Sequence, residues 1–207
     1  MKRIILTTTI IITALLFFRV NYSQNQPLSS RLSEKILRLH VIANSDSDAD
    51  QQLKLMVKEA LVAYMKEHTG TLECKGDYIN YINENADTLK SVAMNTITAH
   101  GFTYNVSLSV ENTYFPIKTY GDLTFPCGNY DALCVRIGNA CGKNWWCVLY
   151  PPLCFIDLTY AVVPDDSKDA LHNIVGDNDY YELISAREDI DVKPRSLIFD
   201  TIIDFFK

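Results

Sequence analysis

Thr103-Tyr-Asn-Val-Ser-Leu-Ser-Val110 is the stretch in which the apolar pattern of this chain changes from the period of a helix to that of a strand. Apolar and polar residues alternate along it, which is typical of a strand with one buried and one solvated face. Before it, apolar residues recur at helical spacing, which predicts long helices over residues 48–67 and 77–99. Helices and strands therefore occur in separate runs, as in α+β proteins.

Three further strands are predicted. Residues 36–43 alternate and are rich in β-branched and leucine side chains, and two more strands are expected at Leu133–Ile137 and Trp145–Tyr150. The Gly/Asn-rich stretch Gly138–Asn144 predicts that the last two strands form an antiparallel hairpin. We expect a single antiparallel or mixed sheet of about four strands, packed by the two long helices on one face.

The N-terminus differs in character from the rest. Lys2 and Arg3 precede an uncharged, mostly apolar run, Ile4–Phe18. This run is shorter than the ~20 residues of a spanning helix and has the length of a signal-peptide core, roughly 7–15 residues. It predicts an exported protein with four parts: a signal peptide or N-terminal anchor (1–23), a polar linker (24–34), an α+β core domain (35–160) and an acidic helical segment (161–207).

The chain of 207 residues carries a formal net charge of −6, and its C-terminal segment is strongly acidic. An acidic exported protein is a poor partner for nucleic acid, whose phosphates attract basic surfaces. Short helices are expected after Ser167, over Asp179–Ala186 and over Arg195–Phe206.

Two segments combine aromatic residues with turn residues. Tyr114–Tyr130 contains two prolines and two glycines, and predicts a long connection of the kind that often carries function. The second segment is Gly142-Lys-Asn-Trp-Trp-Cys-Val-Leu-Tyr-Pro-Pro-Leu-Cys154. Adjacent residues of a strand point to opposite faces, so one of Trp145 and Trp146 needs a second surface, either a covering element or a partner.

Six cysteines in an exported protein favour disulfides. Their spacing does not match the Cys-x-x-Cys pattern of metal sites, and no metal or cofactor is expected. A disulfide between Cys147 and Cys154 is favoured if the turn at Pro151-Pro152 brings the two together, with free buried thiols as the alternative.

No motif of a known catalytic class is present. The sequence lacks Gly-x-Ser-x-Gly, His-Glu-x-x-His and a phosphate-binding glycine loop. His40, Cys147 and Asp46 contain the groups of a triad, but nothing in the sequence places them together. The acidic turn Asp46, Asp48 and Asp50 resembles part of a calcium loop, but the glycine and the distal glutamate of such a loop are missing. Capping of the first helix explains these residues more simply. We therefore expect a binding protein, with an exported envelope hydrolase using a Cys/His or Asp-based site as the alternative.

Three segments resemble motifs of one family. They are Leu39-His-Val-Ile-Ala-Asn-Ser-Asp46 with the following Gln51–Lys58, Tyr114-Phe-Pro-Ile-Lys-Thr-Tyr-Gly-Asp-Leu123, and Gly142–Phe155. In order and spacing they are similar to the stage II sporulation protein R family. The pair Cys147 and Cys154 fits the third motif, whereas Cys127, Cys134 and Cys141 depart from the family pattern.

The resemblance implies a signalling protein of endospore formation. Such proteins are made in the forespore and exported into the space between forespore and mother cell. There they trigger a membrane-embedded aspartic protease, stage II sporulation protein GA, which processes pro-sigma-E. On this basis we expect the partner-binding residues to be His40, Asn44, Asp46, Lys118, Tyr120, Asp122, Lys143, Asn144, Trp145 and Trp146.

Overall fold

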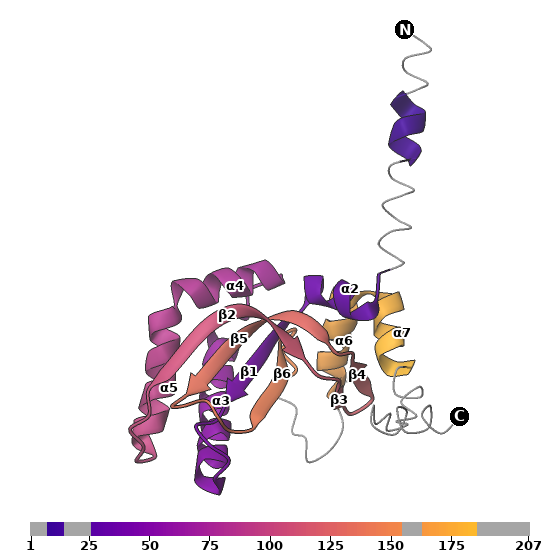
Figure 1. The fold of residues 1–207 in the computed structure, drawn as a ribbon. Coiled ribbons are helices and arrows are strands. Elements are labelled where there is room, and N and C mark those ends of the chain that lie inside the picture. The colour runs from indigo at the N-terminus through magenta and orange to yellow at the C-terminus, as the bar shows by residue number, and fades with distance from the viewer. Residues whose placement is uncertain (1–7, 15–25, 155–162, 186–207) are drawn as a thin grey trace, which may run out of the picture.

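The computed structural model describes residues 8–14, 26–154 and 163–185 (Figure 1). Residues 8–14 are helical. The elements that follow are α2 (Leu28–Lys35), β1 (Leu37–Ile42), α3 (Asp48–His68), α4 (Lys75–Glu84), α5 (Ala86–Ala99), β2 (Val106–Phe115), β3 (Lys118–Tyr120), β4 (Leu123–Phe125), β5 (Gly128–Ile137), β6 (Asn144–Tyr150), α6 (Asp165–Val175) and α7 (Asp177–Ser185). Among the described residues, no helix is long and apolar enough to span a membrane.

The α+β class is confirmed, with a mixed four-stranded sheet in the order β2-β5-β1-β6. β1 is parallel to β5 and antiparallel to β6, and β2 is antiparallel to β5. The predicted hairpin of the last two strands is wrong, because β1 lies between them. The connection crosses the end of β1, where Gly142 N–H donates to the carbonyl of Ala43 at 2.9 Å and Cys141 N–H to that of Asn44 at 3.2 Å.

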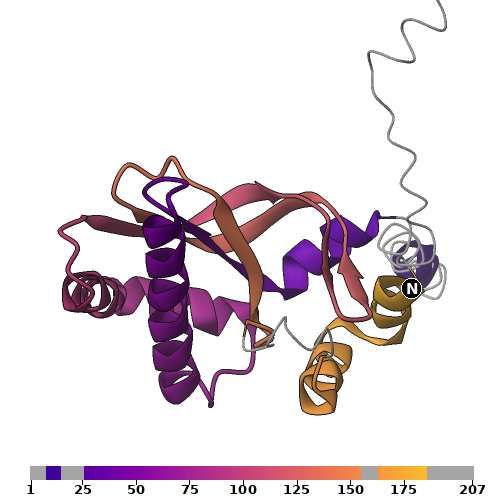
Figure 2. The same ribbon diagram turned by 90° about the horizontal axis from the view of Figure 1, so that it is seen from below.

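The first face of the sheet is covered by α3, α4 and α5, and α3 crosses in front of the strands when the molecule is seen from below (Figure 2). α3 begins as predicted at Ser47, whose hydroxyl accepts the N–H of Asp50 at 3.2 Å. The single helix predicted over 77–99 is two helices, which meet at Asn85. Asn85 has non-helical ψ and its side chain donates to the carbonyl of Tyr81, so the amide competes with helix continuation.

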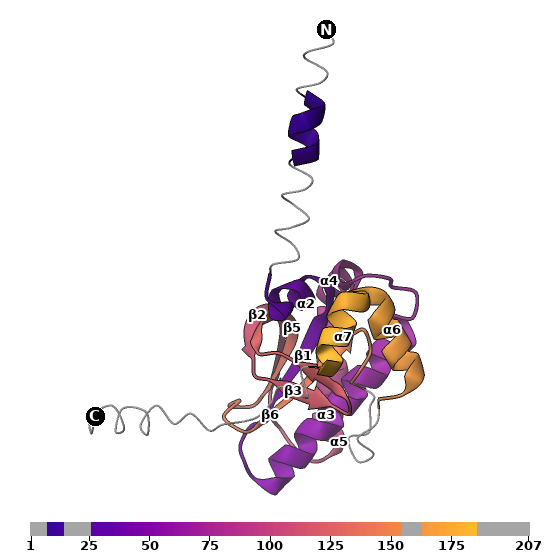
Figure 3. The same cartoon turned by 90° about the vertical axis from the view of Figure 1, so that its right-hand side faces the viewer.

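The second face is also covered at one end, by α2, α6, α7 and the β3–β4 hairpin (Figure 3). The sequence placed helices on one face only and predicted a linker over 24–34. That stretch instead contains the start of α2, whose Leu28 and Leu32 are buried. The long connection predicted over 114–130 is also wrong, since β2, β3, β4 and β5 occupy most of it. Gly121, at φ 59°, makes the tight turn of the hairpin.

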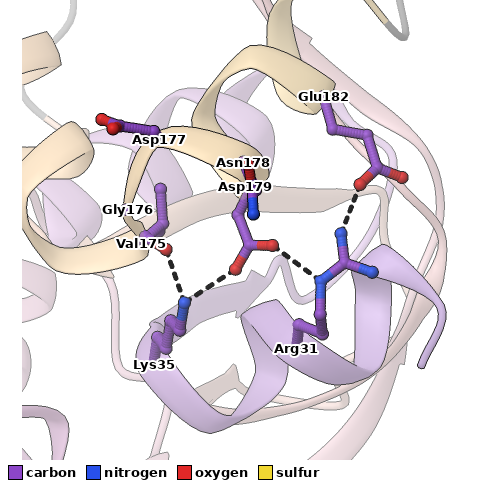
Figure 4. A pocket seen from close by; sticks show the side chains of 8 residues that line it. All are labelled: Arg31, Lys35, Val175, Gly176, Asp177, Asn178, Asp179 and Glu182. Atoms are coloured by element: carbon purple, nitrogen blue, oxygen red, sulfur yellow. Dashed lines mark hydrogen bonds and ion pairs between the residues drawn. The ribbon is translucent and has the colours of Figure 1, made fainter. Parts of the chain in front are cut away.

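Ion pairs join the C-terminal helix α7 to α2. Figure 4 shows an open pocket of about 740 Å³ between α2 and α7. Asp179 accepts from Arg31 at 2.6 Å and from Lys35 at 2.7 Å, and Arg31 also pairs with Glu182. Burial raises the pKa of Asp179, but the two cations outweigh it and hold that pKa below its usual value. The charges of Arg31, Lys35, Asp179 and Glu182 pair with one another, so these ion pairs join α2 to α7 across the pocket.

C-terminal helices were expected, and two are described. α6 begins at Asp165, three residues before the start expected after Ser167, so Ser167 lies within the first turn and does not cap the helix. α7 covers most of the helix expected over Asp179–Ala186. The helix predicted over Arg195–Phe206 lies outside the described residues.

Arg38 of β1 is the largest fully buried side chain among the described residues. Its Nε donates to the carbonyl of Cys147 at 3.0 Å and its Nη2 to the hydroxyl of Tyr120 at 3.4 Å, while Nη1 has no hydrogen-bond partner. The guanidinium carbon lies 4.4, 5.3 and 5.2 Å from the ring centroids of Phe115, Phe125 and Tyr130. Burial lowers the pKa of Arg38, and the aromatic rings compensate part of the lost hydration.

The end of β6 is closed by a covalent bond. Cys147 and Cys154 form a disulfide with their Cα atoms 5.3 Å apart, and the Tyr150–Pro151 peptide between them is cis. Leu153 N–H returns to the carbonyl of Val148 at 3.1 Å, so the chain doubles back along the strand it has just left.

Replacing Arg38 tests what its side chain contributes. Arg38→Ala should lower the free energy of unfolding by about 3 kcal/mol, because it leaves a cavity among the three rings. Arg38→Met should stay within about 1 kcal/mol of the wild type, since it fills the volume without a desolvated charge. Urea denaturation measures both, and equal losses for the two variants would show that the charge and its hydrogen bonds matter more than the volume.

Removing the disulfide tests its role. The double variant Cys147→Ala, Cys154→Ala should lose about 2 kcal/mol of unfolding free energy, because a short closed loop no longer restricts the unfolded chain. The variant Cys74→Ser is the control, since Cys74 is an exposed free thiol. Denaturation of the oxidised proteins gives the comparison; a double variant as stable as the control would contradict the prediction.

Candidate partner-binding surface

The three motif segments meet on the second face of the sheet. His40 of the first motif stacks on Trp146 of the third, with ring centroids 3.7 Å apart. Phe115 of the second motif lies edge-on to both, at 6.0 Å from His40 and 4.7 Å from Trp146. Residues more than a hundred positions apart in sequence thus form one aromatic cluster, because β1 pairs with β6 and β2 reaches the same face through β5.

His40 is neutral in this cluster. Only 7% of the residue is exposed, and its Nε2 atom is buried without a hydrogen-bond partner. Burial lowers the pKa of His40, the nearby Asn144 side chain opposes that effect, and the charge of Arg136 lowers the pKa further. An imidazole that stays neutral, buried and stacked is a packing group, and it is a poor proton donor near neutral pH.

The hydrolase alternative expected a cysteine or an aspartate beside the histidine. Cys147, the cysteine considered in the sequence, is bonded to Cys154 and belongs to the core of the opposite face. Asp46 instead accepts the backbone N–H of Lys143 at 2.6 Å. The structure therefore does not assemble His40, Cys147 and Asp46 into a triad.

Cys134 is the cysteine that does lie near His40, with its Sγ 4.0 Å from Nδ1. The thiol is completely buried, and burial raises its pKa to about 11. A nucleophilic cysteine needs a lowered pKa and access to a substrate. Cys134 has neither, so the pair is part of the core packing.

The second face is polar where the covering helices end. Arg136 of β5 and Glu111 of β2 form a bidentate ion pair at 2.8 and 2.7 Å, and Ser109 donates to the same carboxylate at 2.5 Å. The hydrogen bonds from Arg136 and Ser109 lower the pKa of Glu111 to about 2. The sequence reasoning did not select Arg136 or Glu111; only the pairing of β2 with β5 brings them together.

The predicted residues at the end of β1 form a fixed loop. Asn44 accepts the N–H of Asn139 at 2.9 Å and donates to Asp50 at 2.9 Å. A Cβ atom on Gly138 would lie 2.3 Å from the Asn44 amide oxygen, so only glycine permits this approach. Asn44 therefore shapes the loop, while the exposed side chains of Lys143 and Asn144 remain available to a partner.

The predicted hairpin residues are mostly used by the fold. Tyr120 is buried, and its hydroxyl donates to the carbonyl of Trp146 at 2.9 Å. Asp122 forms an ion pair with Lys168 of α6 at 2.7 Å. Lys118 is half-buried at the start of the hairpin. Tyr120 and Asp122 therefore position the hairpin against β6 and α6.

The two tryptophans point to opposite faces, as predicted. Trp145 packs against the first core, where the Lys58 ammonium lies 4.9 Å from its ring centroid and its Nε1 has no hydrogen-bond partner. Trp146 packs against the second core. Both are half-buried, so the second surface that each tryptophan needs comes largely from this chain.

We define the sheet-end surface as the residues that surround the aromatic cluster and still reach solvent. Its exposed members, from the loop at the end of β1 and the start of β6, are Asp46, Lys143 and Asn144. Its half-buried members, from the sheet, are Trp146, Arg136 and Glu111. This surface combines an aromatic centre with both charge signs at its rim, a composition common in protein interfaces. Within the described residues, no cluster of ligating side chains is arranged to hold a metal ion.

The Glu111–Arg136 pair should make stability depend on pH. The folded pKa of Glu111, about 2, lies below the usual value of 4.5, so its contribution is present above about pH 4.5 and is lost as the pH falls toward 2. With 38% of the Glu111 side chain exposed, screening leaves about 1 kcal/mol at pH 7. Glu111→Gln should lose that amount at pH 7 and match the wild type at pH 2. A constant difference across this range, measured by denaturation, would contradict the assignment.

Comparison with known proteins places the chain in a family. The sequence model of Stage II sporulation protein R matches residues 33–160, a range that includes all three motif segments. The chain is 36% identical over 154 residues to "Stage II sporulation protein R" of Bacillus subtilis (strain 168), covering 72% of this chain and 66% of that protein. No solved structure matches the chain. The chain belongs to the stage II sporulation protein R family.

Proposed function

We propose that this protein is an exported signal of endospore formation which activates a membrane-embedded aspartic protease. The protein is exported from the forespore into the space between forespore and mother cell, either secreted or held by residues 1–23. The protease is stage II sporulation protein GA, and its activation leads to processing of pro-sigma-E. Membership of the stage II sporulation protein R family is the observation that carries this proposal.

The convergence of the three motifs supports a binding role. His40, Phe115 and Trp146 come from separate motifs and make mutual ring contacts directly beneath the sheet-end surface. A rigid, buried base of this kind holds exposed groups in fixed positions, which reduces the entropy lost on binding. Lys143 and Asn144 are held there by the backbone bond from Lys143 N–H to Asp46.

Activation requires differential binding. The protein would bind the active form of the protease more tightly than the inactive form and so shift their populations. Moving that equilibrium from 1:99 to 99:1 takes about 5.5 kcal/mol of differential affinity. A few aromatic and charged contacts at the centre of an interface supply that amount.

The alternative, an envelope hydrolase, has less support. Cys147 is held in a disulfide, and the Cys134 thiol beside His40 is buried with a raised pKa. A protease activator needs neither group as a nucleophile. Cys134→Ser, which preserves the size of the side chain, therefore separates the two functions.

Co-expression in a host that lacks the system tests the proposal. The protein, the protease and the pro-sigma factor are produced together, and cleavage of the pro-sequence is followed. Lys143→Glu should slow processing about tenfold, equivalent to about 1.4 kcal/mol of binding, because it reverses an exposed charge and leaves the backbone bond to Asp46 intact. Tyr181→Ala is the matched control, since Tyr181 is exposed on α7, away from the sheet-end surface.

Two outcomes would contradict the proposed function. Processing that does not depend on the exported wild-type protein would sink the activator function. Loss of processing in Cys134→Ser, with the fold retained by circular dichroism, would favour the hydrolase. Full processing by Cys134→Ser together with a defect in Lys143→Glu is the expected pattern.

A further inference from the structure

β2 is an open edge of the sheet. Gly138 N–H donates to the carbonyl of Asn105 at 2.8 Å, which fixes Asn105 and Gly138 as a hydrogen-bonded pair of the antiparallel register between β2 and β5. Hydrogen-bonded pairs alternate along such a ladder. The odd residues from Ser107 to Phe115 therefore bond to β5, and the N–H and C=O groups of the even residues point away from the sheet: Val106, Leu108, Val110, Asn112 and Tyr114.

The opposite edge of the sheet is closed by the protein itself. The carbonyl of Trp146 in β6 accepts the Tyr120 hydroxyl at 2.9 Å, and the carbonyl of Val148 accepts the N–H of Leu153 at 3.1 Å. In the part of the chain that the structure describes, no hydrogen bond reaches the outward backbone groups of β2. Figure 3 shows β2 at the margin of the body.

β2 also lacks most of the devices that normally keep edge strands apart, and its one charged side chain, Glu111, is paired with Arg136 of β5. Exposed edges are usually interrupted by lysine, proline or a bulge. The ten residues of β2 contain neither lysine nor proline, and their pairing with β5 runs from Val106 to Phe115 without a register shift. Near the end of the strand lies Tyr114, which is 59% exposed. A long, regular edge with an exposed aromatic residue is suited to accept another strand.

We propose that β2 pairs with β2 of a second copy of this chain, antiparallel about a two-fold axis that passes Val110. In this register each even residue faces another even residue, so the outward groups of both strands are satisfied together. Val110 faces Val110, Leu108 faces Asn112, and Val106 faces Tyr114 across the axis. The two four-stranded sheets become one continuous sheet.

Side-chain chemistry selects a second copy and this register. The exposed ring of Tyr114 gains an apolar neighbour in Val106, which is already buried in the first core, and the half-buried Val110 meets its own copy. On the other face, Glu111 lies opposite Ser109, so the carboxylates are not paired with each other. A register centred on Glu111 would place two like charges directly opposite, which is destabilising. The proposal stands on β2 alone and does not depend on the proposed function.

Cross-linking at the axis tests the register. Residues of a hydrogen-bonded antiparallel pair have Cα atoms about 5.5 Å apart, within the range of a disulfide. Val110→Cys should form a disulfide-linked dimer on mild oxidation, in a background in which the exposed Cys74, Cys127 and Cys141 are replaced by serine. Asn112→Cys is the matched control, because it faces Leu108 of the other copy and its own counterpart lies four residues further along.

Blocking the edge tests the dimer itself. Asn112→Pro removes an N–H that points away from β5, so it leaves the ladder within one copy intact and removes a donor from the new pair. Sedimentation equilibrium should show a dimer for the wild type and a monomer for Asn112→Pro, with unchanged circular dichroism. Glu111→Pro, which removes a donor to β5, should instead lower the thermal stability of the single copy.

Three results would contradict the proposed dimer. A wild type that sediments as a monomer at its highest soluble concentration would overturn the proposal. So would a dimer that persists in Asn112→Pro, or equal cross-linking of Val110→Cys and Asn112→Cys. If the wild type is monomeric and Asn112→Pro no longer supports processing, a strand of another protein takes the edge. If the wild type dimerises and Asn112→Pro leaves processing unchanged, the dimer is separate from the proposed function.

Discussion

The arrangement of the strands depends on one long side chain, Arg38, in the middle of the sheet. Its position on β1 faces the second core, and each of the other strands supplies one contact to it: Phe115 from β2, Tyr120 from β3, Phe125 from β4, Tyr130 from β5 and the Cys147 carbonyl from β6. None of the described carboxylates pairs with the guanidinium, so aromatic faces and two oxygen atoms replace water. The β3–β4 hairpin docks where it does because this charge and its rings have to be covered.

That constraint also organises the candidate site. With the hairpin over Arg38, the Tyr120 hydroxyl closes the outer edge of β6 at Trp146, and the Trp146 ring stacks on His40. The covered end of the second face is apolar, and the end beyond His40 is polar and open. The sheet therefore has a closed edge at β6, an open edge at β2 and, between them, the sheet-end surface. The proposed recognition surface and the proposed dimer edge share Glu111 and otherwise use different residues of one sheet.

Local patterns were predictable where a single element explains them. The alternation within residues 103–110 and the capping of α3 by Ser47 depend on neighbouring residues only. The strand is confirmed from Val106 onward, although it continues to Phe115, and the cap is confirmed. Strand order was not predictable in this way. The loop between β5 and β6 has the Gly/Asn-rich composition of a hairpin turn. It instead crosses the end of β1, where the N–H of Gly142 donates to the carbonyl of Ala43. Asn85 breaks a helix whose apolar stripe continues through it, since one side-chain bond is a weak signal beside several leucines and isoleucines.

For the site, the sequence identified the segments and the structure assigned their roles. The sequence by itself determined the family and the α+β class and selected His40 and Trp146 as candidates, because these follow from residue order and short-range periodicity. Only the tertiary structure decided that Cys147 is used in a disulfide, that Tyr120 is buried, and that Arg136 and Glu111 join the surface. Those outcomes depend on which strands become neighbours. The burial of groups such as Arg38 by residues distant in sequence decides the strand neighbours, and a local sequence pattern does not predict such contacts.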